Sequence, residues 1–409
     1  MPGSKHRAST LALLLAPLLL QPMAAADSCR PSERSIRIAS FNVFLNRPSA
    51  GQLYSDLVAG DAQARAVAEI LQRVRPDIVL LGEFDYADNG DLPVDADGDA
   101  VSVFRYDYLG VGQNGAEPIR YDFGFHAPVN TGVPSGFDLN NDGRSDGPED
   151  ALGYGVFPGQ YGMLLLSRFP IDGLATRTFQ NLRWQDMPGN LLPRPFYSDA
   201  EAAALPLSSK SHWDVPVQVN GKTLHVLAAH PTPPVFDGPE DRNGRRNFDE
   251  IRLWADYVRG GRKARYIVDD SGERGGLEPR TRFVILGDYN ADPSDGDSRP
   301  GAIQQLVKNR RVNGRVVPRS LGGALEAARE GGDNLAHRGD PAADTSDFDP
   351  NRAGNLRIDY VLPSRYGLRP VCSGVFWPSA DDPLRRLVGE GEPVVSSDHR
   401  LVWVDVEVR

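Results

Sequence analysis

The sequence has 409 residues, a formal net charge of −10 and only two cysteines. Its length is more than enough for one large core. Its acidic balance excludes a protein that holds nucleic acid or another polyanion by bulk electrostatics, although a bound cation could supply local positive charge to an enzyme that cuts one.

The first 26 residues are predicted to form a secretory signal peptide. Lys5 and Arg7 precede the apolar run LALLLAPLLL, and small residues follow at Ala24 and Ala26. This order is typical of a cleaved export signal, and the apolar run is short for a bilayer span; an uncleaved anchor is the alternative. We therefore expect a secreted or periplasmic protein of 409 − 26 = 383 residues, with net charge −12 and no transmembrane segment in the mature chain.

The two cysteines are Cys29 and Cys372. After export, one disulfide could join the mature N-terminus to the C-terminal third of the chain, and two buried free thiols are the alternative. The sequence leaves both open.

Residues 27–409 are predicted to form a single domain in which strands and helices interleave. The first strand is IRIASFNVF, with residues that alternate in character, and a helix follows from about residue 63 to residue 74, where Pro76 stops it. The run DIVLLGE is a second buried strand, and it ends in Glu83.

After this strand the chain is loop-like, a long insertion at about 84–160 that is rich in Gly, Asp and Pro. The segment FDEIRLWADYV is predicted to be a helix, and further strands are predicted in YGMLLLSRFPI, TLHVLAAHP, FVILGD, LRIDYVLPS and LVWVDVEV. Helices are too few to follow every strand. The pattern therefore favours packed sheets with helices outside over a simple doubly wound sheet.

The insertion contains the acidic segment DLNNDGRSDGPE at residues 138–149. Its oxygen-bearing side chains stand at positions 1, 3, 5, 9 and 12, with glycine at position 6, which is the spacing of an EF-hand calcium loop. Ser145 replaces the apolar residue usual at position 8, and the flanks are not helical, so an isolated Ca²⁺ loop and a solvated acidic turn are both open. The candidate Ca²⁺ ligands are Asp138, Asn140, Asp142, Asp146 and Glu149.

Polar side chains stand at the ends of five predicted strands and just before a sixth. Each has a simple structural explanation, such as a turn, a surface carboxylate or a packed histidine. Their occurrence at successive strand ends favours a shared site. The candidates are Asn42, Glu83, His230, Asp288, Asn290, Asp359, Asp398 and His399.

The segment FVILGDYNADP shows this pattern in detail. Asp288 and Asn290 are two residues apart, so on an extended chain they face the same side. Gly, Asp and Asn also suit a turn, whereas open α/β sheets bind ligands near the carboxyl ends of their strands. The remaining strand ends favour the site.

Seven segments occur in the order found in the endonuclease/exonuclease/phosphatase superfamily, and the chain resembles its DNase I-like members. These segments are SFNVF, PDIVLLGE, LLLSRFPI, LAAHP, ILGDYNADP, RIDYVLPS and SSDHRLV. The last three carry GDYN, IDYVL and SDHRLV, which together are strongly specific. The resemblance implies an α/β fold, a four-layer sandwich of two packed, mostly antiparallel sheets with helices outside.

The resemblance also implies a divalent-metal-dependent phosphoesterase with Mg²⁺ or Mn²⁺. Phosphoester hydrolysis requires neutralised phosphate charge and an activated water, and hard cations prefer oxygen ligands. By resemblance, Glu83 is the principal metal ligand, with Asn42 beside it and Asp398 nearby. Asp288 and Asn290 would position the attacking water and a phosphate oxygen.

Two histidines complete the implied centre. His399 would contact the phosphate or transfer a proton, oriented by Asp359 through its other ring nitrogen. His230 matches a second histidine of DNase I-like members, where it can serve the leaving group.

The leading interpretation is a nuclease-like enzyme that hydrolyses phosphodiester bonds and acts as a monomer. A phosphomonoesterase or a sphingomyelinase-like lipid phosphodiesterase with the same centre is the alternative. A non-catalytic binding module is disfavoured because every expected side chain is present. A calcineurin-like metallophosphatase is excluded because Asp-x-His and Gly-Asn-His motifs are missing. Loops at about 84–160, 180–215 and 260–281 would set the substrate.

Overall fold

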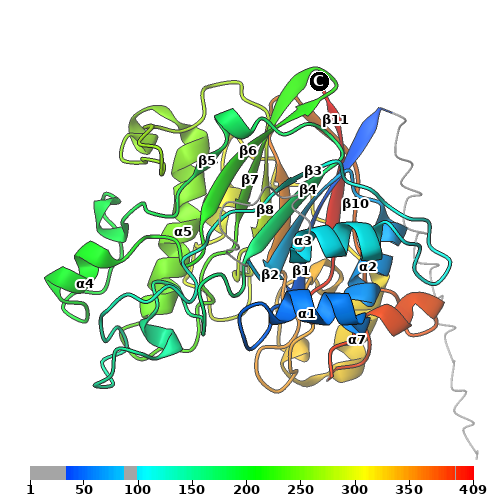
Figure 1. The fold of residues 1–409 in the computed structure, drawn as a ribbon, viewed down its shortest axis with the longest axis horizontal. Coiled ribbons are helices and arrows are strands. Elements are labelled where there is room, and N and C mark those ends of the chain that lie inside the picture. Colours follow the sequence, from blue (N-terminus) through cyan, green and yellow to red (C-terminus); the bar gives the residue numbers. More distant parts are fainter. Residues whose placement is uncertain (1–33, 87–98, 392) are drawn as a thin grey trace, which may run out of the picture.

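A computed structural model describes residues 34–86, 99–391 and 393–409 of the chain. The predicted signal peptide and Cys29 lie outside the described residues. Two sheets pack face to face, and helices cover their outer faces (Figure 1). This arrangement is the four-layer α/β sandwich that the sequence predicted.

The strands form one six-stranded sheet, in the order β10-β11-β1-β2-β4-β3, and one five-stranded sheet, in the order β5-β6-β7-β8-β9. Neighbouring strands are antiparallel except in the pairs β1–β2 and β7–β8, so the sheets are mostly antiparallel, as expected. The strand bounds are β1 Ser35–Leu45, β2 Ile78–Phe84, β3 Phe123–Phe125, β4 Met163–Ser167, β5 Arg177–Thr178, β6 His212–Val219, β7 Lys222–Ala229, β8 Phe283–Asp288, β9 Asp359–Pro363, β10 Leu368–Val375 and β11 Val402–Val408.

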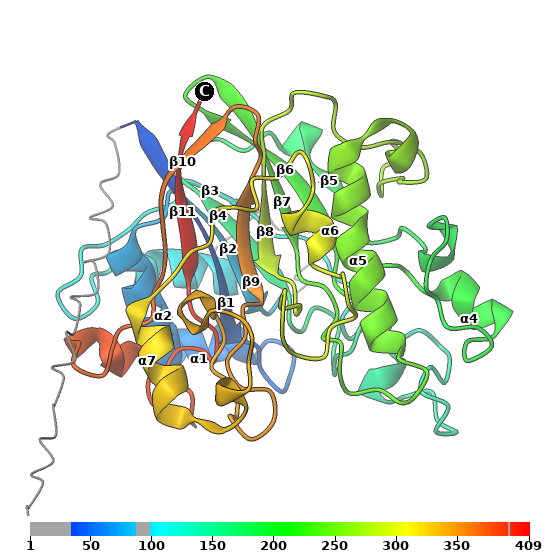
Figure 2. The same cartoon turned by 180° about the vertical axis from the view of Figure 1, so that it is seen from behind.

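Helices α1 to α3 cover the six-stranded sheet, and α5 and α6 lie against the five-stranded sheet (Figures 1 and 2). The α-helices are α1 Gln52–Ala59, α2 Ala62–Val74, α3 Ala100–Val103, α4 Asp199–Ala204, α5 Arg242–Arg259, α6 Gln304–Val307 and α7 Leu321–Glu330. A π-helix spans Phe104–Leu109, and short 3₁₀ helices span Pro148–Asp150, Gly173–Ala175, Trp184–Asp186, Gly261–Ala264, Gly332–Leu335, Pro341–Ala343 and Pro383–Leu387.

Strand alternation produces the layers, because successive side chains of a strand face opposite sides of its sheet. On β1, Ile38 faces the apolar layer between the two sheets, whereas Phe41 packs under the helices. On β8, Val284 faces the same inner layer, whereas Ile285 belongs to the outer apolar layer that also contains Trp254 of α5. The three apolar layers pack the two sheets against each other and against their helices.

Both predicted helices form. Helix α2 begins after Asp61, whose side chain accepts a hydrogen bond from the backbone nitrogen of Ala64, and it ends two residues before Pro76. Helix α5 is longer than predicted and extends from residue 242 to residue 259.

The insertion is less irregular than predicted, since it contains α3, the π-helix and β3. The side chains of Val101, Phe104 and Tyr108 are buried under α2, and this tertiary packing stabilises helices too short to stand alone. Strands β6 and β10 were not predicted. Each contains a proline, Pro216 in β6 and Pro370 in β10, which weakens a strand pattern in the sequence.

Cys372 on β10 is disulfide-bonded, which excludes a free thiol at this position. The other cysteine of the sequence, Cys29, is not among the described residues. Within residues 34–86, 99–391 and 393–409, no helix combines the length and apolar character that a membrane span requires.

Candidate active site

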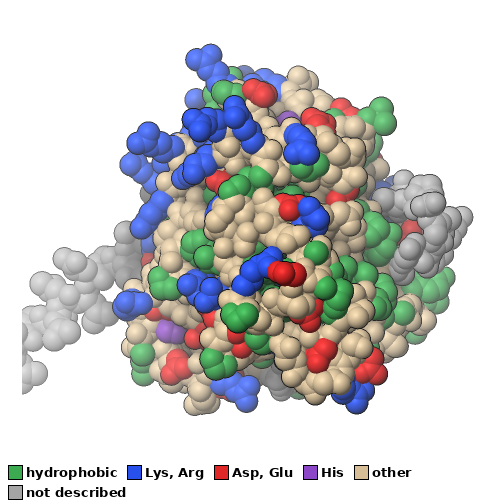
Figure 3. Space-filling view, turned by 90° about the vertical axis from the view of Figure 1, so that its left-hand side faces the viewer, with side chains coloured by type: hydrophobic (Ala, Val, Ile, Leu, Met, Phe, Trp, Pro, Cys, Tyr) green, Lys and Arg blue, Asp and Glu red, His purple; other side chains and the backbone are tan. Residues whose placement is uncertain are grey.

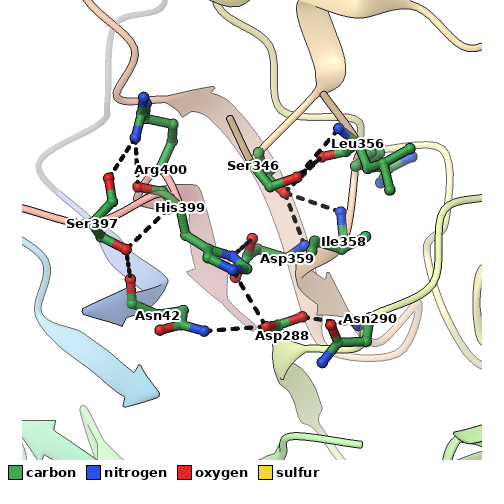
Figure 4. A network of polar contacts seen from close by, with 12 residues as sticks. Asn42, Asp288, Asn290, Ser346, Leu356, Ile358, Asp359, Ser397, His399 and Arg400 are labelled. Atoms are coloured by element: carbon green, nitrogen blue, oxygen red, sulfur yellow. Dashed lines mark hydrogen bonds and ion pairs between the residues drawn. The ribbon is translucent and has the colours of Figure 1, made fainter. Parts of the chain in front are cut away.

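Side chains from both sheets meet at one edge of the sandwich (Figure 4). Asn42 of β1 and Glu83 of β2 come from the six-stranded sheet, and Asp288 of β8 comes from the other. The Nδ2 of Asn42 donates to Glu83 Oε1 at 3.0 Å and to Asp288 Oδ2 at 3.2 Å. One amide therefore joins the two sheets.

The end of β8 depends on Gly287. Its φ is 147°, and a Cβ at this position would lie 1.8 Å from the backbone oxygen of Ala229 on β7. Only glycine allows this close approach. The approach brings Asp288 beside the loop that follows β7, where His230 lies, at an Oδ2–Nε2 distance of 3.4 Å.

His399 is held from three sides. Its Nδ1 donates to Asp359 Oδ2 at 2.8 Å, and its backbone nitrogen donates to Ser397 Oγ at 2.9 Å. Ser397 Oγ in turn donates to the backbone oxygen of Asn42 at 2.7 Å, and the ring presents Nε2 to Asp288 Oδ2 at 3.7 Å (Figure 4). The predicted orientation of His399 by Asp359 is therefore present as a contact.

The two histidines differ in charge. Burial lowers the pKa of His230 well below its ordinary value, so its ring is neutral. Burial also opposes protonation of His399, but the carboxylates of Asp359 and Asp288 outweigh it and raise the pKa of His399 well above its ordinary value. Burial raises the pKa of Asp288 to about 7. Asp288 thus lies between a neutral imidazole and an imidazolium.

Asn290 follows Asp288 in a left-handed conformation, with φ of 49°. Its backbone nitrogen donates to Asp288 Oδ1 at 2.9 Å, and its Nδ2 donates to the backbone oxygen of Pro231 at 3.1 Å. These bonds tie the loop after β8 to the loop after β7.

Glu83 has two neighbours that the sequence did not single out. Asn46 Nδ2 donates to Glu83 Oε2 at 2.8 Å. Lys210 is buried, and within the described ranges its ammonium has neither a hydrogen bond nor an ion pair closer than 4.0 Å. Burial lowers the pKa of Lys210, while Glu83, Glu250 and Asp288 oppose this shift. No motif marked either residue; Asn46 directly follows β1, and Lys210 precedes β6 by two positions.

The donor set fits a hard divalent cation. Burial raises the pKa of Glu83, against the effect of Lys210, and the charge of Asp398 adds to the shift. The Oδ1 of Asp398 is buried and has no hydrogen-bond partner in the described part of the chain. Asn42 directs its amide nitrogen to Glu83, whereas its Oδ1 accepts from the backbone nitrogen of Phe44 at 3.2 Å.

A second group of possible metal ligands, with carboxylate oxygens and an imidazole nitrogen, lies beside these candidate ligands. One ligand atom each from Asp288, Asp359 and His399 lies within 4.8 Å of the other two, and all three residues are buried. The resemblance assigned Asp288 to water positioning, His399 to phosphate contact or proton transfer, and Asp359 to the orientation of His399, rather than to metal binding.

The acidic loop lies apart from this centre in sequence and is exposed. The backbone nitrogen of Gly143, with φ of 91°, donates to Asp138 Oδ2 at 2.8 Å, and Arg144 pairs with Asp146 at 3.0 Å. Among the described residues, this loop contributes no group of three acidic side chains with oxygens within 4.8 Å of one another. The sequence reasoning missed Asp150, which is buried and accepts from the backbone nitrogens of Leu139 at 2.8 Å and Gly147 at 3.0 Å.

Residues 39–399 match the Endonuclease/Exonuclease/phosphatase family. A search of curated proteins gives no match. Among solved structures, an endonuclease/exonuclease/phosphatase from Beutenbergia cavernae has a TM-score of 0.50 and 18% identity over 92% of this chain and 72% of that chain. A family protein from Leptotrichia buccalis has a TM-score of 0.47 and 13% identity over 91% of this chain and 99% of that chain. Sphingomyelinase C from Streptomyces griseocarneus has a TM-score of 0.43 and 14% identity over 91% and 99%.

The family match covers nearly all of the described strands and every predicted site residue. The likeness to the Beutenbergia cavernae structure agrees with it in fold. The chain therefore belongs to the Endonuclease/Exonuclease/phosphatase family, whose members hydrolyse phosphoester bonds.

Proposed function

We propose that the protein is a divalent-metal-dependent phosphodiesterase that is exported and acts as a monomer. The observation that carries the proposal is the contact of Asn42 with both Glu83 and Asp288, because it places a candidate cation ligand beside a candidate water-positioning carboxylate. His399 faces the same Asp288 oxygen at 3.7 Å. A hydrogen-bond donor, an acceptor and the proposed cation ligands therefore lie at one edge of the sandwich.

Each side chain has a role that its contacts support. Asp288 Oδ2 accepts hydrogen bonds and orients a water molecule for attack on phosphorus. His399 as an imidazolium donates to a phosphate oxygen, and Asp359 keeps the Nε2 of the ring directed at the centre. His230 remains neutral and lies 3.4 Å from Asp288, where it can accept or return a proton at Nε2.

Glu83, Asn42 and Asp398 are the residues proposed to hold Mg²⁺ or Mn²⁺. When bound, such a cation neutralises phosphate charge and stabilises the leaving oxygen. The buried carboxylate of Glu83, whose hydrogen-bond donors among the described residues are both neutral amides, and the unpartnered Oδ1 of Asp398 support this assignment. A Ca²⁺ ion in the acidic loop is a separate proposal, and it rests on residue spacing alone.

The sequence favoured nucleic acid as the substrate, and a small or lipid phosphoester was the second candidate. Figure 3 shows Lys and Arg side chains gathered toward the upper left of one face. Exposed basic residues, among them Arg259, Arg262 and Lys263, follow the C-terminal end of α5, whereas Asn247 near the other end lies beside the centre. Twelve helical residues separate these ends, roughly 18 Å along the axis. This separation favours the second candidate, because the basic patch does not adjoin the centre.

The decisive experiment assays purified protein of residues 27–409 with Mg²⁺ and with EDTA. Its substrates are DNA, RNA, bis(p-nitrophenyl) phosphate, p-nitrophenyl phosphate and sphingomyelin. We expect EDTA-sensitive hydrolysis, with diesters preferred over the monoester. Preference for the monoester would move the assignment to a phosphatase, and no hydrolysis of any substrate would leave only a binding module.

A further inference from the structure

Helix α5 buries a polar stripe as well as an apolar one. Asn243, Arg246, Asn247 and Glu250 follow the spacing i, i+3, i+4 and i+7, which places them on one face of the helix. Asn247 and Glu250 are fully buried. Buried polar groups are costly unless they are hydrogen-bonded, so their partners show what this face does.

Glu250 joins two loops. Its Oε1 accepts from the backbone nitrogen of Ser209 at 2.7 Å and from Ser209 Oγ at 3.1 Å, next to Lys210. Its Oε2 accepts from the backbone nitrogen of Thr232 at 2.7 Å, two residues after His230. One carboxylate thus fixes the loop before β6 against the loop after β7.

Asn247 joins the second of these loops to a third. Its Nδ2 donates to the backbone oxygen of Thr232 at 2.8 Å and to the backbone oxygen of Tyr289 at 2.9 Å. Tyr289 lies between Asp288 and Asn290 in the sequence. Thr232 is therefore held at its nitrogen by Glu250 and at its oxygen by Asn247, which leaves this peptide little freedom.

We propose that Asn247 and Glu250 are positioning residues that hold the loops bearing Lys210, His230 and Asp288 in the arrangement needed for reaction. This inference rests on the proposed function. The candidate cation ligands Asn42 and Glu83 lie on the other sheet, so the α5 residues control the half of the centre that handles phosphate and proton. Displacement of reacting groups by about 1 Å can cost about 100-fold in rate, which is the scale at stake.

The adjacent residue Asp249 is a matched control. It is also fully buried on α5, but its Oδ2 accepts from Trp184 Nε1 at 2.8 Å and from the backbone nitrogen of Leu191 at 2.6 Å. These partners carry none of the site residues. Glu250→Gln sets an amide nitrogen against one of the donors that Glu250 binds, whereas Asp249→Asn can place its nitrogen at the position of Oδ1, which has no hydrogen-bond partner among the described residues.

The experiment measures kcat, KM, half-saturating Mg²⁺ and Tm with bis(p-nitrophenyl) phosphate. For Glu250→Gln we expect kcat to fall about 10- to 100-fold, with KM and half-saturating Mg²⁺ within about twofold of wild type. For Asp249→Asn we expect a smaller loss of Tm, because the oxygen that accepts both hydrogen bonds is kept, with kcat within about twofold of wild type. A role in stability alone would give both variants the same kinetics.

The outcomes separate the two proposals. A wild-type protein that hydrolyses no substrate overturns the proposed function and this inference together. An active wild type with unchanged kcat in Glu250→Gln, or an equal kcat loss in Asp249→Asn, overturns the inference alone. Where Glu250→Gln does not fold, Ser209→Ala carries the test, because it removes only the 3.1 Å hydroxyl bond. A kcat reduced about two- to fivefold at unchanged Tm supports positioning, and an unchanged kcat contradicts it.

Discussion

Asp288 is the side chain on which the polar contacts of the centre converge. Its Oδ2 accepts from Asn42 and faces both histidines, while its Oδ1 accepts from the backbone of Asn290. Because these partners come from β1, from two loops and from the segment before β11, a change at Asp288 alters their geometry without opening an apolar layer.

Substitutions at Glu83 and Asp288 should therefore lower activity in different ways. We expect Glu83→Gln to lower activity and to require more Mg²⁺, because the amide lacks the charge that holds a cation. We expect Asp288→Asn to lose about 10²- to 10⁴-fold in kcat, with no rescue by added Mg²⁺. Titration of activity against Mg²⁺ distinguishes the two, and Tm should shift little in either variant.

His399→Ala should be as damaging as Asp288→Asn, and Asp359→Asn should reproduce part of the loss, because the ring of His399 loses its 2.8 Å partner. If Asp288→Asn and His399→Ala both kept near-wild-type turnover on the best substrate, the assigned centre would be wrong.

Lys210 is predicted to bind phosphate. The Lys210 side chain is largely buried, and its ammonium has no ion pair within 4.0 Å in the described residues, although Glu83 and Asp288 are near enough to oppose the shift of its pKa. We expect Lys210→Met, which keeps the stem, to lower kcat/KM about 10²-fold through loss of one charged donor. Lys222→Met is the control, since that ammonium donates to the backbone oxygen of Val408 at 3.0 Å, away from the centre. Equal activity in both variants would contradict the assignment.

The sequence predicted the residues that stand at strand ends, and it missed those that only the fold brings there. Asn42, Glu83 and Asp288 each follow a recognisable buried run, so their neighbourhood follows from sheet geometry. Lys210 and Asn247 belong to a loop and to a helix whose buried polar face resembles an exposed one in sequence. Their roles depend on contacts such as Asn247 with Thr232 and Tyr289, which no local pattern encodes.

At the scale of the elements, β8 is the strand whose end is most tightly constrained. Gly287→Ala should strain the backbone by about 1–3 kcal/mol, and the overlap with the Ala229 oxygen adds to this. We expect a lower Tm together with lost activity, because Asp288 moves with the strand end. Chemical unfolding and kcat measured on the same sample test this, and Gly173→Ala is the control, since a Cβ there meets nothing within 4 Å.

The acidic loop makes a separate prediction. If it binds Ca²⁺, the cation should raise the Tm of the wild type but not of Asp142→Ala, because a ligand of the native state adds stability. Thermal melting with Ca²⁺ and with EDTA measures this. Equal shifts in both proteins would make the loop a solvated turn, whose shape Asp150 already fixes through Leu139 and Gly147.

Proline accounts for two of the strands that the sequence did not predict. Strand β6 contains Pro216, and β10 contains Pro370 beside a register shift, so neither shows an uninterrupted strand pattern. The segment from α3 through the π-helix is short and is helical because Phe104 and Tyr108 pack under α2. Strand β8 was predictable because burial on both faces leaves an apolar run in the sequence, whereas β1 and β11 were predictable from alternation.

At the scale of the whole molecule, the four-layer sandwich was predictable because the ordered motifs of the sequence resemble those of a family with this fold. The alternating valines of β11 illustrate how such a sequence forms layers. Val402, Val404 and Val406 all face the layer between the sheets.

Export is a prediction at the same scale. Mass spectrometry of protein recovered outside the cytoplasm should show a start near Asp27, and an intact Met1 end would contradict it.

The pairing of β1 with β11 has a consequence for biosynthesis. The ladder joins Ser35 to Glu407, so β1 can pair with β2 early but finds its second neighbour, β11, only when that strand has been translated. A ribosome-bound chain that stops before residue 397 already carries Asn42, Glu83 and Asp288 but has neither His399 nor the strand that links β10 to β1. Such long-range closure is slow. A nascent chain of this kind has no complete centre, so the candidate site can assemble only after residues 397–409 have been translated.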